Sequence, residues 1–113
     1  MLKPEQPIGI FDSGVGGLTV VSAIKHLLPN ERIIYFGDTA HLPYGDKSGE
    51  TIVKYSTHIA DFLLEQDVKI ILVACNTVSA VAYNELARHL ADKVYLINVI
   101  DPVVNYIARH FSG

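Results

Sequence analysis

Short apolar runs alternate along the chain with longer stretches in which apolar residues recur at helical spacing. The runs are β-branched and nearly continuous, which is typical of parallel strands that are covered on both faces. The predicted strands are Ile8–Phe11, Arg32–Phe36, Lys69–Ala74 and Val94–Ile100. Strands that alternate with helices form βαβ units with right-handed crossovers. We therefore predict an α/β fold, with a four-stranded parallel sheet and helices on both faces.

Apolar stripes predict the helices that connect these strands. The stripes cover Leu18–Leu27, Ile52–Leu63 and Val78–Leu90. A further helix is expected from Asp101-Pro102, because an N-cap residue followed by proline is a typical helix start. The pattern contains no internal repeat and no low-complexity linker, so we predict a single domain over residues 1–113.

The connection from Gly37 to Glu50 is longer than the pattern requires. Connections from a strand to a helix usually take about 2–6 residues. This one leaves the carboxyl end of the second strand, the edge where ligands bind in open α/β sheets. Long ordered loops at such an edge are often binding loops, so we expect it to contribute to a site.

Composition narrows the class of protein. Half of the residues are apolar and 19% are charged, which excludes a disordered chain. The net charge is −3 and there is no Lys/Arg cluster, which argues against nucleic acid as the main ligand. No apolar run approaches the ~18 residues of a membrane span. A single cysteine cannot form an internal disulfide, so we expect a cytoplasmic protein without a membrane segment.

That cysteine, Cys75, stands where the third predicted strand ends and the next helix begins. A thiol at this junction faces the positive end of a helix dipole, which favours the thiolate. Most free cysteines are simply small buried apolar residues, so the position alone leaves both interpretations open. Asn76 adds an amide donor and acceptor beside it, while Thr77 would serve as the N-cap of the helix.

A glycine-rich stretch, Asp12-Ser13-Gly14-Val15-Gly16-Gly17, follows the first strand. It resembles a dinucleotide-binding loop, but Thr19 occupies the third glycine position, and the Asp12 carboxylate would repel a pyrophosphate. Asp38 ends the second strand where a ribose-binding acid would lie, so a nucleotide ligand stays an alternative. An N-cap followed by a tight turn explains the same stretch without any ligand.

The remaining candidates are less specific. Tyr44 lies between Pro43 and Gly45, so turn formation and ligand contact explain it equally well. The histidines have no spacing that suggests a metal site; His41, in the long connection, stays undecided. Together the residues predict a cleft with one activatable and accessible thiol, a nearby carboxylate and several hydrogen-bond donors. Such a site suits proton transfer on a small anionic molecule.

Three stretches of the chain resemble the glutamate racemase family, whose members make D-glutamate for peptidoglycan without a cofactor. They are Ile10–Thr19, Asp38–Gly45 and Ala74–Thr77, in the family's order and at fitting intervals. The related aspartate and hydantoin racemases share the fold and a strand-end cysteine, but as a rule not the Asp-Ser-Gly-Val-Gly-Gly-Leu opening. The resemblance implies that the chain is the N-terminal one of two similar domains.

It also implies a mechanism in which two cysteines exchange protons with the α-carbon of L- and D-glutamate, with no cofactor and no metal. Catalysis would fall to Cys75 and Asp12, with Asp12 close to the thiol. Substrate binding would fall to Asp12, Ser13, Tyr44, Gly45, Asn76 and Thr77. The resemblance does not extend to roles for Asp38 or His41.

The chain departs from the family in length, because it lacks the second cysteine, which the family carries in a Gly-Cys-Thr-His stretch. We therefore expect these 113 residues to be part of a longer enzyme and to be inactive alone; the complete enzyme could be a homodimer. The alternatives are a racemase of a related substrate such as aspartate, and a non-catalytic module that binds a small anion or nucleotide.

Overall fold

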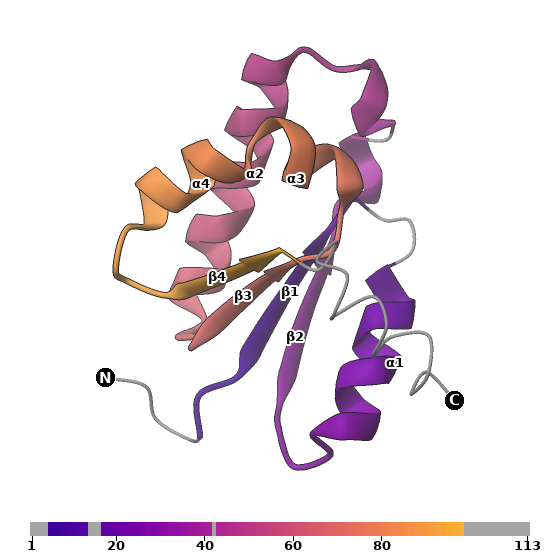
Figure 1. The fold of residues 1–113 in the computed structure, drawn as a ribbon, viewed down its shortest axis with the longest axis vertical. Coiled ribbons are helices and arrows are strands. Elements are labelled where there is room, and N and C mark those ends of the chain that lie inside the picture. The colour runs from indigo at the N-terminus through magenta and orange to yellow at the C-terminus, as the bar shows by residue number, and fades with distance from the viewer. Residues whose placement is uncertain (1–4, 14–16, 42, 99–113) are drawn as a thin grey trace.

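A computed structural model describes residues 5–13, 17–41 and 43–98 of the chain and shows a four-stranded sheet flanked by helices (Figure 1). The strands are β1 (Ile8–Asp12), β2 (Ile33–Gly37), β3 (Ile70–Val73) and β4 (Tyr95–Asn98). They lie in the order β2-β1-β3-β4, and every neighbouring pair is parallel. The predicted fold class is thus confirmed.

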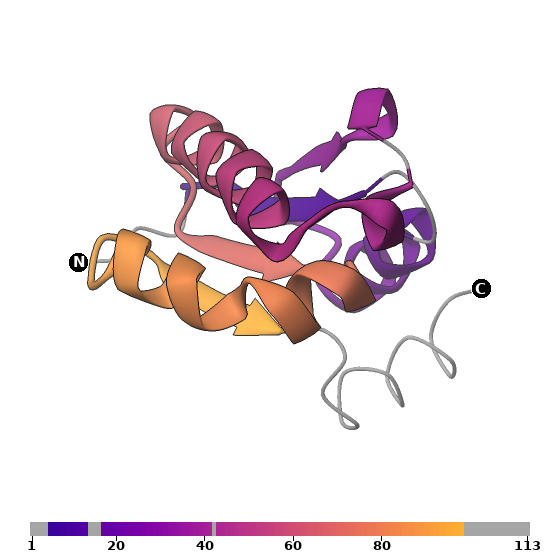
Figure 2. The ribbon, with the colours of Figure 1, turned by 90° about the horizontal axis from the view of Figure 1, so that it is seen from above.

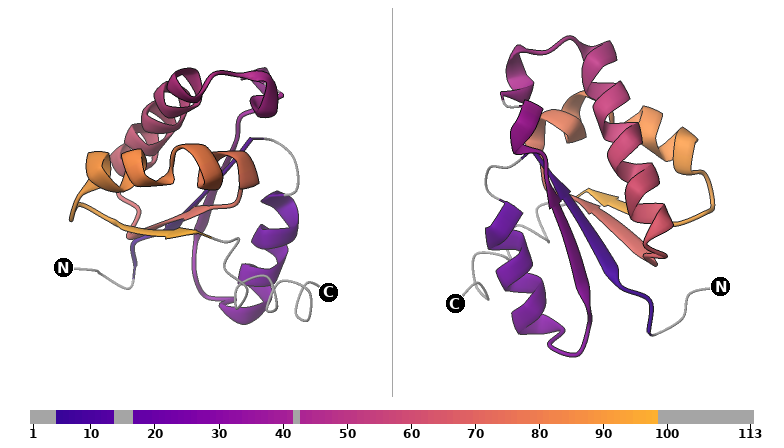
Figure 3. Two further views of the ribbon diagram at one scale, coloured as in Figure 1. Left: turned by 45° about the horizontal axis from the view of Figure 1, so that its top comes forward. Right: turned by 180° about the vertical axis from the view of Figure 1, so that it is seen from behind.

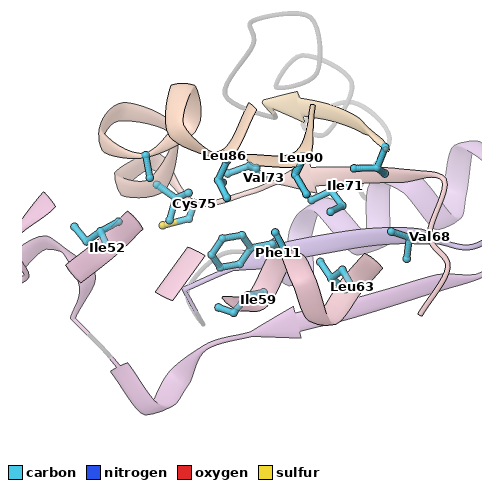
Figure 4. Close-up of a cluster of buried hydrophobic side chains, with 14 of the residues drawn as sticks. Phe11, Ile52, Ile59, Leu63, Val68, Ile71, Val73, Cys75, Leu86 and Leu90 are labelled. Atoms are coloured by element: carbon cyan, nitrogen blue, oxygen red, sulfur yellow. The ribbon is translucent and has the colours of Figure 1, made fainter. Parts of the chain in front are cut away.

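Helices cover both faces of this sheet (Figures 2 and 3). They are α1 (Gly17–Leu27), α2 (Gly49–Glu65), α3 (Asn76–Val81) and α4 (Tyr83–Leu90). On the α1 face, Ile8, Ile10 and Leu72 form a small cluster. On the other face, under α2, α3 and α4, a larger cluster is built around Phe11 (Figure 4). Because neighbouring residues of a strand point to opposite faces, β1, β2 and β3 each supply both clusters.

The edge strand β4 differs from its prediction. Its near-continuous apolar sequence predicts two covered faces, yet Tyr95 is 62% exposed and Ile97 is 38% exposed. The prediction is wrong for these side chains because α1 packs against β1 and β2, at the far side of the sheet. The predicted end of this strand at Ile100 lies outside the described residues.

The helix predicted over Val78–Leu90 is interrupted. Ala82, with φ −118° and ψ −2°, separates α3 from α4. The Ser79 hydroxyl donates to the Asn98 side chain at 2.8 Å, and the Tyr83 hydroxyl donates to the Leu96 carbonyl at 3.0 Å. Each half is therefore tied separately to β4, a tertiary constraint that apolar spacing does not encode.

The long connection between β2 and α2 contains two short 3₁₀ turns, η1 (Thr39–His41) and η2 (Tyr44–Asp46). It ends at Ser48, whose hydroxyl oxygen accepts a hydrogen bond from the Thr51 N–H at 3.1 Å and caps α2. No helix in the described part of the chain is long and apolar enough to cross a membrane. The helix predicted from Asp101 and residues 14–16 of the glycine-rich stretch lie outside the described residues.

Candidate active site

The carboxyl ends of three neighbouring strands bring the candidate residues to one edge of the sheet. The Asp38 N–H donates to the Asp12 carbonyl at 2.9 Å, and the Ala74 N–H donates to the Phe11 carbonyl at 2.8 Å. Backbone pairing therefore continues past the strand ends. It sets Asp12, at the end of β1, between Asp38 on one side and the segment that leads to Cys75 on the other.

The pleat of the sheet separates the side chains of Asp12 and Cys75. Asp12 follows Phe11, whose ring packs in the cluster under α2, so the pleat directs the Asp12 side chain to the α1 face. Cys75 belongs to the α2 cluster, as Val73 does two residues before it. The carboxylate and the thiol thus lie at the same edge of the sheet and are directed to opposite faces.

Cys75 lies at the predicted junction, but it is only 5% exposed. It belongs to the same buried cluster as Tyr44, Ile52 and Val78, and its sulfur is turned toward Ile52 of α2 (Figure 4). The expectation of an open, accessible thiol is therefore wrong for this structure. The physical reason is that α2 and the connection before it close over the end of β3, a packing that no local motif reveals.

Cys75 is itself the N-cap residue of α3, although its side chain makes no capping hydrogen bond. The predicted N-cap, Thr77, is the second residue of the helix, so that prediction is wrong. Thr77 is half-buried, and Asn76 beside it is exposed. The Asn76 amide is thus available at the edge of the sheet to a ligand placed there.

Tyr44 is anchored by a buried polar network. Its hydroxyl donates to Asp38 Oδ2 at 2.5 Å, and His41 Nδ1 lies 2.7 Å from the same oxygen. The His41 ring stacks on Tyr55 of α2, with 3.8 Å between the ring centroids. Burial, followed by the hydrogen bond and the charge of Asp38, raises the pKa of Tyr44 well above its ordinary value. The hydroxyl is therefore a hydrogen-bond donor at any neutral pH.

This network gives Asp38 and His41 a structural role, which the resemblance does not assign to them. Asp38 is 6% exposed and its carboxylate already binds Tyr44 and His41, so it is not presented as a ribose-binding acid. The signal in the sequence was an acid at a strand end with a histidine three residues later. No pattern in the sequence predicts that Tyr55 contacts His41, because Tyr55 belongs to α2 and meets His41 only through tertiary packing.

Asp12 has a partner that sequence reasoning missed. The carboxylate is fully buried, and Tyr35 of β2 donates its hydroxyl to Asp12 Oδ2 at 3.1 Å. Burial, then the charge of Asp12 and this hydrogen bond, raise the pKa of Tyr35. Tyr35 lies inside a predicted strand, and the sequence pattern does not distinguish it from the apolar residues around it.

The remaining candidates, Ser13 and Gly45, differ in their exposure. Ser13 is 8% exposed, whereas Gly45 is exposed and a Cβ atom built on it would meet nothing within 4 Å. A pocket of about 240 Å³ opens beside the network; its lining residues are Phe36, Asp38, His41, Tyr55, His58, Ile59 and Phe62. Neither Cys75 nor Asp12 lines it, so this pocket is separate from the thiol.

Within residues 5–13, 17–41 and 43–98, no three His, Cys, Asp or Glu side chains are grouped so that they could hold a metal ion. What the edge offers is a shielded thiol and a buried carboxylate on opposite faces of one sheet. The Asn76 amide and the backbone at Gly45 are exposed at the same edge. These are groups that can move a proton and orient a small polar molecule.

Comparison with known proteins finds glutamate racemases among the relatives of this chain, although no protein-family model matches it. The glutamate racemase of Geobacter metallireducens is 54% identical over 99 residues, which are 88% of this chain and 36% of that protein. The glutamate racemase of Thermus thermophilus is 51% identical over 111 residues, 98% of this chain and 42% of that protein. The chain thus spans about two fifths of the length of these relatives.

A solved structure agrees with these sequences. The glutamate racemase of Francisella tularensis in complex with D-glutamate superposes with a TM-score of 0.82 at 49% identity. The superposition covers 87% of this chain and 37% of that one. At this identity the likeness extends beyond the fold to the sequence.

Proposed function

This chain is homologous to part of the glutamate racemases, and from this we propose that it is the domain that supplies one of the two catalytic groups of such an enzyme. The complete enzyme interconverts L- and D-glutamate by proton transfer at the α-carbon, without a cofactor. Cys75 acts on one face of that carbon. Residues 1–113 form one domain of the enzyme, and the D-glutamate serves peptidoglycan synthesis in the cytoplasm.

The chemistry requires two acid–base groups. Inversion through a planar carbanion needs a base on one face of the carbon and an acid on the other. Cys75 is the only cysteine among these 113 residues, so a second thiol must come from outside them. In one direction the Cys75 thiolate takes the α-proton while the second thiol delivers a proton to the opposite face; in the other direction the roles reverse.

The surroundings of Cys75 support this role. Tyr44 and Ile52, in the same buried cluster, shield the sulfur from bulk water. Shielding strengthens the electrostatic interactions that stabilise a carbanion, and it limits exchange of the abstracted proton. We propose that Asp12 and Ser13 contact the amino-acid head of the substrate, that Tyr44 and Gly45 line the site, and that Asn76 and Thr77 hold a carboxylate.

The observation that carries the proposal is the place of this single cysteine. It lies at the β3–α3 junction of a domain that is about half identical in sequence to glutamate racemases, one of them solved with D-glutamate bound. A thiol can reach the thiolate state near neutral pH, and a serine hydroxyl cannot. Replacing Cys75 by serine therefore changes one atom and removes the base.

The test uses the complete enzyme, encoded by the reading frame that continues this sequence. Cys75→Ser should lower the turnover of both glutamate enantiomers by at least about a thousandfold. The matched control is Ala80→Ser, which places a hydroxyl at an exposed position of the same helix and should leave turnover unchanged. In heavy water, the wild-type enzyme should incorporate deuterium at the α-carbon. Full activity of Cys75→Ser would contradict the proposal.

Four further measurements test the alternatives and the remaining parts of the proposal. The 113-residue chain alone should show no racemisation, because only one face of the α-carbon meets a base. Aspartate in place of glutamate tests a racemase of the related substrate. Calorimetry with glutamate and with a mononucleotide tests the non-catalytic module, for which only the nucleotide would bind. Sedimentation of the complete enzyme tests whether it is a homodimer.

A further inference from the structure

We propose that Tyr35 is a positioning residue that orients the Asp12 carboxylate through its hydroxyl, and that Gly37 is a glycine because a side chain there would displace that hydroxyl. The proposal rests on the proposed contact of Asp12 with the substrate. It adds two residues within β2 to a site that is otherwise assigned to the end of β1 and to the segments that follow β1, β2 and β3.

The register of the sheet explains how the two side chains meet. Ile10 pairs with Tyr35, and Asp12 pairs with Gly37, so Tyr35 lies diagonally across from the carboxylate and on the same face. To reach Asp12 Oδ2 at 3.1 Å, the tyrosine side chain must lean along β2 over Gly37. The glycine is the position that this ring crosses.

Space, and not backbone conformation, accounts for the glycine. A Cβ atom at position 37 would lie 2.7 Å from the Tyr35 hydroxyl oxygen and 3.1 Å from two carbons of its ring. Real Cβ contacts do not fall below 3.0 Å, so any side chain there would push the hydroxyl away from Asp12. The backbone of Gly37 is that of a strand residue paired with Asp12, which other residues adopt as well.

The electrostatics make the tyrosine a dedicated donor. Asp12 is fully buried, and a buried carboxylate needs hydrogen-bond donors to offset the loss of water. Burial and the negative charge of Asp12 raise the pKa of Tyr35, so its hydroxyl keeps its proton throughout the neutral range. A donor held on one carboxylate oxygen fixes the plane of the carboxylate, and therefore the direction from which Asp12 meets a substrate.

Kinetics of the complete enzyme test this role. Tyr35→Phe keeps the ring and removes the hydroxyl, and it should lower kcat/KM about tenfold, as expected for a lost hydrogen bond to a charged group. Gly37→Ala should also lower kcat/KM, because the added Cβ atom displaces the Tyr35 hydroxyl. In the Tyr35→Phe background the added alanine should cost less than twofold, because the closest contact is gone. The control Tyr95→Phe removes an exposed hydroxyl and should change nothing.

A double-mutant cycle distinguishes positioning from general support of the fold. If Tyr35 acts through Asp12, Tyr35→Phe should have almost no further effect on kcat/KM in the Asp12→Asn background. If the two substitutions lower kcat/KM by independent factors that multiply in the double variant, the proposal is overturned. Full activity of Tyr35→Phe together with a strongly reduced kcat/KM of Asp12→Asn would also overturn it.

A second readout does not depend on racemisation. The tyrosine ¹³Cζ NMR signal that disappears in Tyr35→Phe reports the ionisation of Tyr35 in the complete enzyme. In Asp12→Asn this signal should titrate at lower pH than in the wild type, because the charge that raises the pKa is gone. If the signal titrates at the same pH in both proteins, the proposed hydrogen bond is overturned. If the shift appears but Asp12→Asn is fully active, the bond stands and the proposed role of Asp12 fails.

Discussion

Cys75 and Asp12 lie at one edge of the sheet, but their surroundings differ in kind. Cys75 is enclosed by apolar side chains of the larger cluster, with Tyr44 as its polar neighbour. Asp12 lies on the smaller, α1 face and is held by the hydroxyl of Tyr35. The surroundings of the thiol are thus held by apolar packing, and the carboxylate is held by a hydrogen bond. Substitutions near Cys75 should therefore act through lost packing, and substitutions near Asp12 through a lost hydrogen bond.

The largest effect is expected from opening the apolar side. Ile52→Ala removes a side chain that is 2% exposed, and it should lower the free energy of unfolding by about 2–5 kcal/mol. It should also speed the reaction of iodoacetamide with Cys75 in the folded protein, which the wild-type packing slows. Urea unfolding and mass spectrometry measure the two effects.

The matched change on the opposite face is Ile24→Ala in α1. Ile24 is half-buried and packs on the α1 face, so the variant should be less destabilised and should leave the alkylation rate of Cys75 unchanged. Equal acceleration in both variants would show that Cys75 is exposed by general loosening of the fold rather than by loss of its local cover.

A smaller effect is expected from the polar neighbour of the thiol. Tyr44→Phe removes the hydroxyl that donates to Asp38, and the free energy of unfolding should fall by about 1.5–3 kcal/mol, because the acceptor is a buried carboxylate. The control is Tyr83→Phe, whose hydroxyl donates to a neutral carbonyl and whose loss should cost about 0.5–1.5 kcal/mol. Equal losses would argue against a charged Asp38.

Tyr35, beside Asp12, and Tyr44, beside Cys75, should make the folding stability depend on pH in the same way. The pKa values of Tyr35 and Tyr44 are raised by folding, so the unfolded chain loses these protons first. Stability from this source is complete below about pH 10, the ordinary tyrosine pKa, and is lost as the pH rises above it. Urea unfolding between pH 8 and 11 measures the fall.

Variants assign this alkaline loss. Tyr35→Phe and Tyr44→Phe should each flatten the fall in stability above pH 10, whereas Tyr95→Phe, at an exposed position, should leave its slope as it is. An alkaline slope that persists in the double variant Tyr35→Phe/Tyr44→Phe would contradict the assignment to these two tyrosines.

The smallest effect on stability is expected at Gly45. A Cβ atom there meets nothing within 4 Å, so Gly45→Ala should change the free energy of unfolding by less than about 0.5 kcal/mol. If Gly45 lines the substrate site, the same variant should raise KM for glutamate in the complete enzyme. An unchanged KM would remove Gly45 from the proposed site.

The sequence by itself determined the α/β class, the parallel strands and the placement of Asp12, Asp38 and Cys75 at strand ends. These features are local, because apolar period, turn residues and caps act within a few positions of the chain. Tertiary structure decided the rest. It fixed which face Asp12 and Cys75 occupy, the enclosure of the thiol, and the break at Ala82.

It also decided which residues serve the candidate site from neighbouring elements. Tyr35 reaches Asp12 only because the register pairs Asp12 with Gly37, and Tyr55 meets His41 only because α2 packs beside η1. Such contacts depend on strand register and helix packing. Both follow from the balance of the whole core, so no single stretch of the sequence specifies them.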